Sequence, residues 1–342
     1  MSISGRRFGL LVLAWVLAAG ASSSAFASSP GSTNPTMRVQ FIHMNQHLSD
    51  MYGLGTYIGL RYPDLSGPSL ERLRMTGVDW VREEFTASDL HHSVSAPLQF
   101  QNDDRVINQE RRDGLHILGL LDYNNTFNGE SHTNMPHRDI QRLTRDFVAY
   151  VSATVRHYRN QIYYWQVWNE PDLHEFWGPE TYAQDYAYLL RQAYGAIKQA
   201  NPQAKVLIGG PSGRDPHGMH FLKRVIQFGG KFDIMSAQPY TTEPGPDFGL
   251  TLQKLRAFHK PVWVTEMGWA GEAYCGPCGS PWDQAARLTT AYFIAAIDGI
   301  DRMFWYDFRD DGLGPNFPDH FGLVEWNLAA KPAYFSFETS LF

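Results

Sequence analysis

The chain has 342 residues, of which 43% are hydrophobic and 14% aromatic, and its formal net charge is -6. This length would allow several small domains, but an α/β barrel uses roughly 250 residues or more as a single domain. No stripe of basic residues stands out, which argues against a nucleic-acid-binding protein.

The chain begins with the pattern of a cleavable secretory signal peptide. Arg6 and Arg7 form a positive n-region, residues 8–21 form an apolar h-region, and residues 25–27 (AFA) offer a cleavage site with small side chains. The apolar run is short for a membrane span. We therefore expect cleavage after Ala27 and a secreted or periplasmic protein that has no membrane association after cleavage.

Residues 28–40 are small, polar and contain Pro and Gly, so we expect a flexible lead-in before one domain over residues 41–342. Within that domain, short apolar segments alternate with longer helical patterns. The segments predicted as strands are Thr56–Leu60, Val78–Phe85, Leu115–Asp122, Ile162–Asn169, Ala204–Gly210, Phe232–Gln238, Pro261–Glu266 and Asp301–Asp307. Many are nearly continuous apolar runs, as expected for strands that are covered on both faces.

The clearest helical pattern runs from Pro179 to Ala200, with apolar side chains along one stripe and Asn201-Pro202 at its end. Arg138–Tyr158 and Asp283–Asp298 show similar patterns. Eight strands alternating with helices indicate either a (β/α)8 barrel or a doubly wound sheet. Because no glycine-rich nucleotide-binding motif follows the early strands, we expect an α/β fold of the (β/α)8 TIM barrel type.

Two of the predicted strands lead into a glutamate at their C-terminal ends. The fourth strand ends in Trp168, Asn169 and Glu170, and Pro171 cannot continue a sheet ladder. The seventh strand is apolar until Glu266. Because the C-terminal ends of barrel strands form the face where active sites assemble, we expect both glutamates on one rim.

Paired carboxylates on one rim suit the cleavage of a glycosidic bond. In a retaining glycosidase the two groups lie about 5–5.5 Å apart. One of them protonates the leaving oxygen, while the other attacks the anomeric carbon and forms a covalent glycosyl-enzyme. Their surroundings must keep one group protonated and the other ionised near neutral pH.

The only two cysteines, Cys275 and Cys278, follow the seventh strand in the sequence Cys-Gly-Pro-Cys. Behind a signal peptide, this spacing favours a local disulfide that stiffens a loop. A catalytic redox pair and two free thiols remain alternatives.

Trp-Asn-Glu-Pro at residues 168–171 and Thr-Glu-Met-Gly-Trp at residues 265–269 resemble the signatures of clan A glycoside hydrolases. Residues 164–213, and the Ala-Lys-Pro-Ala-Tyr segment at 330–334, further resemble glycoside hydrolase family 39. That family includes β-xylosidases, α-L-iduronidases and bacterial exopolysaccharide endoglycosidases. Since the sequence ends just after the predicted eighth helix, we expect it to be most similar to the single-domain bacterial exopolysaccharide-cleaving relatives.

The resemblance implies roles for individual residues. Glu170 matches the general acid/base and Glu266 the nucleophile. Asn169 matches the amide that hydrogen-bonds the sugar 2-hydroxyl, a contact that strengthens as the anomeric carbon gains positive charge. Arg82 matches an arginine beside the nucleophile, and Tyr240 matches a tyrosine that donates to it.

Further residues are expected to contact substrate. Trp305 matches an aromatic floor beneath the sugar. Trp177 and Trp269 fall in loops of the active face, where indole rings stack well on sugar C–H groups, although packing within the loops is the alternative. Gln238 departs from the family pattern, which often has His two residues before the tyrosine; Gln can hydrogen-bond but cannot titrate.

These observations predict a retaining glycosidase that hydrolyses a β-linked polysaccharide or oligosaccharide as a monomer, without a metal or an organic cofactor. The alternatives are a transglycosylase that remodels a polysaccharide and a catalytically silent carbohydrate-binding barrel. Calcium at the aspartates within residues 307–319 remains a further alternative, although they lack EF-hand spacing.

Overall fold

The structure, a computed structural model, describes residues 50–90, 97–124, 133–178, 180–211, 217–241, 244–271, 279–314 and 317–340. The predicted signal peptide, the lead-in, and Cys275 and Cys278 lie outside these residues. The expectations about them stay predictions.

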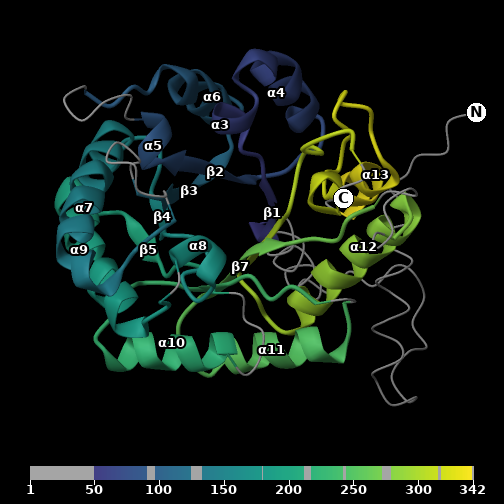
Figure 1. Cartoon of the computed structure of the whole chain (residues 1–342). Helices are drawn as coiled ribbons and strands as arrows, with labels where there is room; N and C mark the ends of the chain where they lie inside the picture. The colour runs from purple at the N-terminus through teal and green to yellow at the C-terminus, as the bar shows by residue number, and fades with distance from the viewer. Residues whose placement is uncertain are drawn as a thin grey trace, which may run out of the picture.

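Eight parallel strands lie at the centre of the molecule (Figure 1). Their order in the sheet is β5-β4-β3-β2-β1-β8-β7-β6. They are β1 (Tyr52–Gly55), β2 (Trp80–Thr86), β3 (His116–Asp122), β4 (Tyr164–Val167), β5 (Lys205–Leu207), β6 (Met235–Ala237), β7 (Val262–Met267) and β8 (Arg302–Trp305). The pairing of β1 with β8 brings the first and last strands of the chain side by side.

The two strands at the ends of this order, β5 and β6, are joined by single contacts that complete the circle. Leu207 forms a parallel bridge with Ile234, and the Ile208 N–H donates to the Ile234 carbonyl at 3.3 Å. The expected (β/α)8 barrel is therefore confirmed.

Helices surround the strands on the outside (Figure 1). The α-helices are α3 (Ile58–Arg61), α4 (Ser66–Arg74), α5 (Ala87–Leu90), α6 (Gln101–Arg112), α7 (Ile140–His157), α8 (His174–Trp177), α9 (Ala183–Ala200), α10 (His217–Gln227), α11 (Pro246–Arg256), α12 (Pro281–Ile297) and α13 (Pro332–Ser340). Short 3-10 turns occupy Pro63–Leu65, His137–Asp139 and Phe317–His320. Within the described ranges, no helix is both long and apolar enough to cross a membrane.

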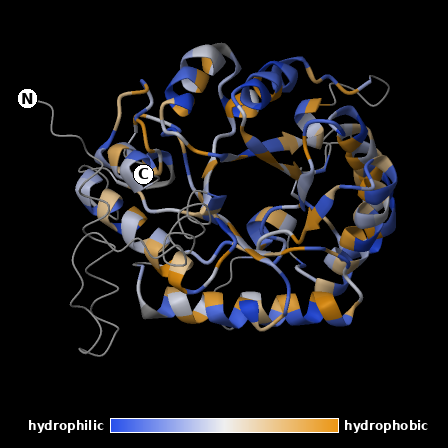
Figure 2. Cartoon of the chain, turned by 180° about the vertical axis from the view of Figure 1, so that it is seen from behind, coloured by the Kyte–Doolittle hydropathy of each residue, from blue (hydrophilic) through white to orange (hydrophobic). Residues whose placement is uncertain are grey.

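Hydrophobic side chains fill two zones. One small cluster contains side chains from strands all around the circle and therefore lies inside the barrel: Trp80, Leu118, Leu207, Ile234, Trp263 and Phe304. The larger cluster packs the outer face of the strands against the helices. Figure 2 accordingly shows hydrophobic segments along the strands, and hydrophobic and hydrophilic residues alternating along the helices.

The prediction for the first strand was wrong. Thr56–Leu60 is a loop followed by α3, and β1 lies four residues earlier, in Tyr-Gly-Leu-Gly. Gly53 is required there because a Cβ at this position would lie 2.5 Å from the Phe304 ring. The two glycines reduce the hydrophobic signal of the strand. The other seven predicted strands, and the three predicted helices, overlap elements of the structure.

Candidate functional site

Both predicted carboxylates lie at the C-terminal ends of strands. Glu170 follows β4 by three residues, and Glu266 is the next-to-last residue of β7. The chain turns sharply after β4, where Trp168 and Glu170 adopt the left-handed backbone region with φ of 71° and 42°. This conformation costs a non-glycine residue roughly 1–2 kcal/mol and is often found where function requires it.

Arg82 connects the surroundings of the two glutamates. It is fully buried on β2. Its Nη1 donates to Glu266 Oε2 at 2.8 Å and also to the Tyr57 hydroxyl, and its Nη2 donates to Asn169 Oδ1 at 3.1 Å. One guanidinium thus contacts side chains from β7, from the loop after β1 and from the loop after β4.

Glu266 accepts hydrogen bonds from two directions. Arg82 binds Oε2, and the Tyr240 hydroxyl donates to Oε1 at 2.7 Å. The Glu266 side chain remains 14% exposed, so the carboxylate keeps an open side. Both donors stabilise a negative charge, and the one from Arg82 is charge-assisted. The arrangement suits an ionised carboxylate that can be approached by a ligand.

Glu170 has the opposite surroundings. Burial raises the pKa of its carboxyl well above the usual value, and the negative charge of Glu266 raises this pKa further, while Arg82 opposes the shift. Its Oε1 lies 3.1 Å from the side-chain amide of Gln238, which follows β6. The two carboxyl groups therefore have different surroundings: burial and a neighbouring negative charge act on Glu170, whereas two hydrogen-bond donors contact Glu266.

The three tryptophans expected to contact sugar are largely buried. Trp305 has no exposed surface, and its Nε1 donates to the Phe321 carbonyl at 3.3 Å. Trp269 is 5% exposed and packs against Trp305 with ring centroids 5.9 Å apart. Trp177 packs against Trp168 and Tyr186 with no face open. The packing of Trp177 gives no support to its predicted sugar contact.

Several polar side chains extend the site beyond the residues found in the sequence. Tyr57 bonds to Arg82, and Arg61 lies over the Tyr57 ring at 4.4 Å. Arg61 also donates to the Tyr306 hydroxyl at 3.3 Å and to Asp311 at 2.9 Å. The misplaced first strand concealed Tyr57 and Arg61, because both follow β1 directly.

A second pair of carboxyl groups lies beside this network. Burial raises the pKa of Glu84 on β2 and of Asp122 at the end of β3, and the charge of Glu84 raises that of Asp122 further. The next residue, Tyr123, contacts Asn169 at 3.4 Å. The rule that identified Glu170, a polar residue where an apolar strand ends, would also have identified Asp122 and Tyr123.

Among the described residues, no group of three or more His, Cys, Asp or Glu side chains is arranged to hold a metal ion. The aspartates after β8 have protein partners. Asp310 binds the Lys331 ammonium at 2.8 Å, and Asp311 binds Arg61.

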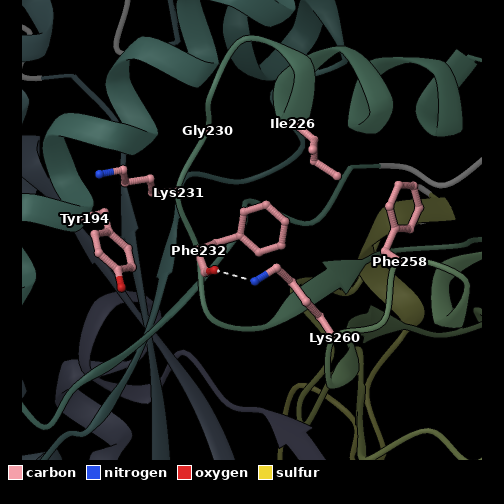
Figure 3. Close-up of a pocket in the computed structure, with 7 residues that line it drawn as sticks. All are labelled: Tyr194, Ile226, Gly230, Lys231, Phe232, Phe258 and Lys260. Atoms are coloured by element: carbon pink, nitrogen blue, oxygen red, sulfur yellow. Dashed lines mark hydrogen bonds between the residues drawn. The ribbon is translucent and has the colours of Figure 1, made fainter.

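Figure 3 shows a separate pocket, away from the two glutamates in sequence. It has a volume of about 350 Å³ and includes Phe232, just before β6, and Lys260, just before β7. The Lys260 ammonium donates to the Phe232 carbonyl at 3.0 Å. Residues that precede these strands lie at their N-terminal ends, away from the two glutamates.

Residues 133–246 match the family model described as glycosyl hydrolases family 39. This range contains Asn169, Glu170 and Tyr240. No curated protein matches the chain in sequence. The resemblance to family 39 noted in the sequence is thus confirmed, and that family consists of glycoside hydrolases.

Solved structures share the fold of the chain. A family 39 glycoside hydrolase from Bacteroides cellulosilyticus WH2 matches with a TM-score of 0.68 and 20% identity over 86% of this chain and 64% of that one. The GH39 enzyme from Xanthomonas axonopodis pv. citri matches with a TM-score of 0.64 and 19% identity over 84% and 65%. Xylanase 10B from Thermotoga petrophila RKU-1 matches with a TM-score of 0.61 and 16% identity over 87% and 95%. The chain spans less than two thirds of the length of the first two.

Proposed function

We propose that this chain, which matches glycosyl hydrolases family 39 over residues 133–246, hydrolyses O-glycosidic bonds of a β-linked polysaccharide or oligosaccharide with retention of configuration. Glu170 is the general acid/base and Glu266 the nucleophile. The observation that carries this proposal is the Arg82 network, which contacts Glu266 directly and reaches the neighbourhood of Glu170 through Asn169.

The chemistry follows from the two environments. In the first step, protonated Glu170 gives its proton to the leaving oxygen while a carboxylate oxygen of Glu266 forms a bond to the anomeric carbon. In the second step, ionised Glu170 takes a proton from water, and the water oxygen replaces Glu266 at that carbon. The raised pKa of Glu170 supports the first role. The two hydrogen bonds that Glu266 accepts support its role as the nucleophilic carboxylate.

A glycan panel with product sizing and immediate proton NMR tests this function. We expect a β-linked substrate to be cleaved and the β-anomer to appear first. Glu170→Gln and Glu266→Gln should each lower turnover at least about a thousandfold, whereas Glu71→Gln on the exposed face of α4 should leave it unchanged. An α-anomer as first product, or an active Glu266→Gln variant, would contradict the mechanism.

The same panel separates the alternatives. Binding without cleavage would indicate a carbohydrate-binding barrel. Oligosaccharides longer than the substrate, formed with excess sugar acceptor, would indicate transglycosylation, because water and sugars attack the same covalent intermediate.

We further propose that residues 1–27 are removed as a signal peptide and that the mature protein acts as a monomer outside the cytoplasm. The n-region, h-region and cleavage pattern support export. N-terminal sequencing of the mature protein should begin at Ser28, and light scattering should give the mass of one chain. An intact leader on the mature protein would contradict the export proposal.

A further inference from the structure

Two buried side-chain amides lie between Arg82 and Glu170. Gln238 is fully buried and Asn169 is 8% exposed. Each side-chain amide has one atom that faces the other amide, here called the inner atom, and one that faces away, the outer atom. The two inner atoms lie 2.6 Å apart, and Arg82 Nη2 lies 3.1 Å from the inner atom of Asn169 and 3.2 Å from that of Gln238. The outer amide atom of Asn169 lies 3.4 Å from the Tyr123 hydroxyl, and that of Gln238 lies 3.1 Å from Glu170 Oε1. The four side chains form one row, Tyr123–Asn169–Gln238–Glu170.

Of the two inner amide atoms, one must be an oxygen and the other a nitrogen. A guanidinium has only donors, so Arg82 Nη2 needs at least one amide oxygen beside it. Two amide oxygens 2.6 Å apart would repel each other and would leave no hydrogen bond between Asn169 and Gln238. Either Asn169 or Gln238 therefore supplies the oxygen, and if one amide turns over, the other must turn as well.

In the first arrangement, the inner oxygen belongs to Asn169. It accepts from Arg82 Nη2 and from Gln238 Nε2. The outer atoms are then Asn169 Nδ2, which donates to the Tyr123 hydroxyl oxygen, and Gln238 Oε1, which faces Glu170 Oε1. Two oxygens can share this contact only when Glu170 carries a proton and donates it to Gln238.

In the second arrangement, both amides are turned over. The inner oxygen belongs to Gln238 and accepts from Arg82 Nη2 and Asn169 Nδ2, while Gln238 Nε2 donates to Glu170. The outer Asn169 oxygen then faces the Tyr123 hydroxyl, which can donate. An ionised Glu170 requires this arrangement, because a carboxylate can only accept. The two arrangements use the same heavy-atom positions, and amide O and NH₂ are nearly equal in size, so both fit the packed site.

We propose that Asn169 and Gln238 form an amide relay that turns over with the protonation state of Glu170. The relay rests on the proposed function, because an acid/base residue must be stable with its proton in one step and without it in the next. Gln238 cannot titrate, so it accepts the proton of the protonated form only with its oxygen toward Glu170, and it donates to the ionised form only with its nitrogen there. Gln238 is thus a positioning residue that acts through Glu170.

Neutron diffraction tests the relay without any substrate, because it distinguishes a deuterated amide nitrogen from oxygen. Crystals would be measured at two pD values, one at which a deuteron is seen on Glu170 and one at which it is absent. We expect Gln238 Nε2 to face Asn169 at the lower pD and Glu170 at the higher one, with Asn169 inverted between them. In Glu170→Ala crystals both amides should keep one orientation. The same orientation at both pD values in the unmodified protein would overturn the relay.

A second measurement follows the titration of Glu170 by carbon-13 NMR of protein labelled at the glutamate carboxyl carbon, with Glu170→Gln to assign the signal. Gln238→Met removes both hydrogen bonds at nearly constant volume. The bond to the ionised form is the stronger one, so the midpoint of Glu170 should rise by about one pH unit. Gln227→Met on the exposed side of α10 should leave it unchanged.

A Glu170 midpoint that falls, or does not move, in Gln238→Met would also overturn the relay. Neither measurement requires activity. Failure of the relay is therefore distinguishable from failure of the proposed function, which the glycan panel tests.

Discussion

Arg82 makes contacts that depend on the shape of the guanidinium. Its two terminal nitrogens reach Glu266 and Tyr57 on one side and Asn169 on the other. A lysine would keep the charge, but its compact ammonium cannot span these partners. Both proposed catalytic residues therefore depend on one buried side chain for their positions.

Arg82→Lys should lower kcat/KM by about 10- to 100-fold, because the charge beside Glu266 remains while the bond to Asn169 is lost. The rate on the substrate identified by the glycan panel measures this effect. Arg74→Lys, on the exposed side of α4, is the matched control. Equal activity of Arg82→Lys and the unmodified protein would show that the two terminal nitrogens of the guanidinium have no role beyond their charge.

The protonation of Glu170 should determine how kcat/KM falls at alkaline pH. A general acid works only while protonated, and the pKa of Glu170 is raised by burial and by Glu266. The kcat/KM value should therefore persist to higher pH than an ordinary glutamate would allow, and it should fall as pH rises through the pKa of Glu170. With an aryl glycoside whose leaving group needs no proton, this alkaline fall should vanish in Glu170→Gln. Its persistence would assign the fall to another group.

The convergence of strand ends in a barrel predicted Glu170 and Glu266, and the family resemblance implied Arg82 and Tyr240. Glu170, Glu266, Arg82 and Tyr240 were identified from separate segments, and the structure brings them into one network. Solvent exposure was not predictable in this way. Trp177 lies in a loop of the active face, yet neighbouring aromatic rings enclose it.

A pair of buried glutamates lies between β2 and α6, on the outer side of the barrel. Glu83 accepts from Thr56 and from the Ile58 N–H, at the start of the segment that carries Tyr57. Burial raises the pKa of both Glu83 and Glu110, and the charge of Glu83 raises that of Glu110 further. The nearby Asp103 has a pKa raised to about 7 by burial and by the charge of Glu83.

These carboxyl groups should make stability depend on pH. The folded chain holds protons that the unfolded chain releases above its ordinary glutamate pKa of about 4.3. The contribution of these groups to the free energy of unfolding is therefore complete below that pH and is lost as pH rises from there through the raised pKa values of the folded state. Glu110→Gln, which cannot ionise, should be more stable than the unmodified protein by about 1–3 kcal/mol at pH 8 and nearly equal to it at pH 4. Denaturant unfolding at the two pH values measures the difference; an equal effect at both would contradict a raised pKa of Glu110.

Gly209, just after β5, supports the turn that carries the acid/base. A Cβ there would lie 2.5 Å from the Val167 carbonyl oxygen and 2.8 Å from that of Trp168. Gly209→Ala should therefore displace this turn and lower the free energy of unfolding by about 1–3 kcal/mol. Gly195→Ala, within α9 and with open space around it, should instead raise it by about 0.4–1 kcal/mol. Denaturant unfolding and activity of both variants provide the comparison, and a Gly209→Ala variant with unchanged stability would contradict the contact.

Seven of the eight strands could be predicted because they are covered on both faces, and many of them are therefore nearly continuous apolar runs. The first could not. Gly53 and Gly55 occupy half of β1, where the Phe304 ring approaches Gly53 and the Tyr57 ring approaches Gly55. The contact between Gly53 and Phe304 arises only when the last strand closes the circle beside the first. Local sequence contains no sign of that contact.

At the scale of the whole molecule, the closed barrel is what brings Glu170 and Glu266 together. Glu170 follows β4 and Glu266 lies in β7. Because both strands end on the same rim, Arg82 can contact Glu266 and also Asn169, the residue before Glu170. The central claim is that Glu266 attacks the sugar while Glu170 handles the proton.

Trapping of the covalent intermediate tests this claim most directly. The protein would be incubated with 2-deoxy-2-fluoro-β-glycosyl fluorides of the sugars that the panel shows to be cleaved, and the modified peptide would be identified by mass spectrometry. We predict one glycosyl group per chain, attached to Glu266 and absent from Glu266→Gln. Attachment to any other residue would contradict the proposed mechanism.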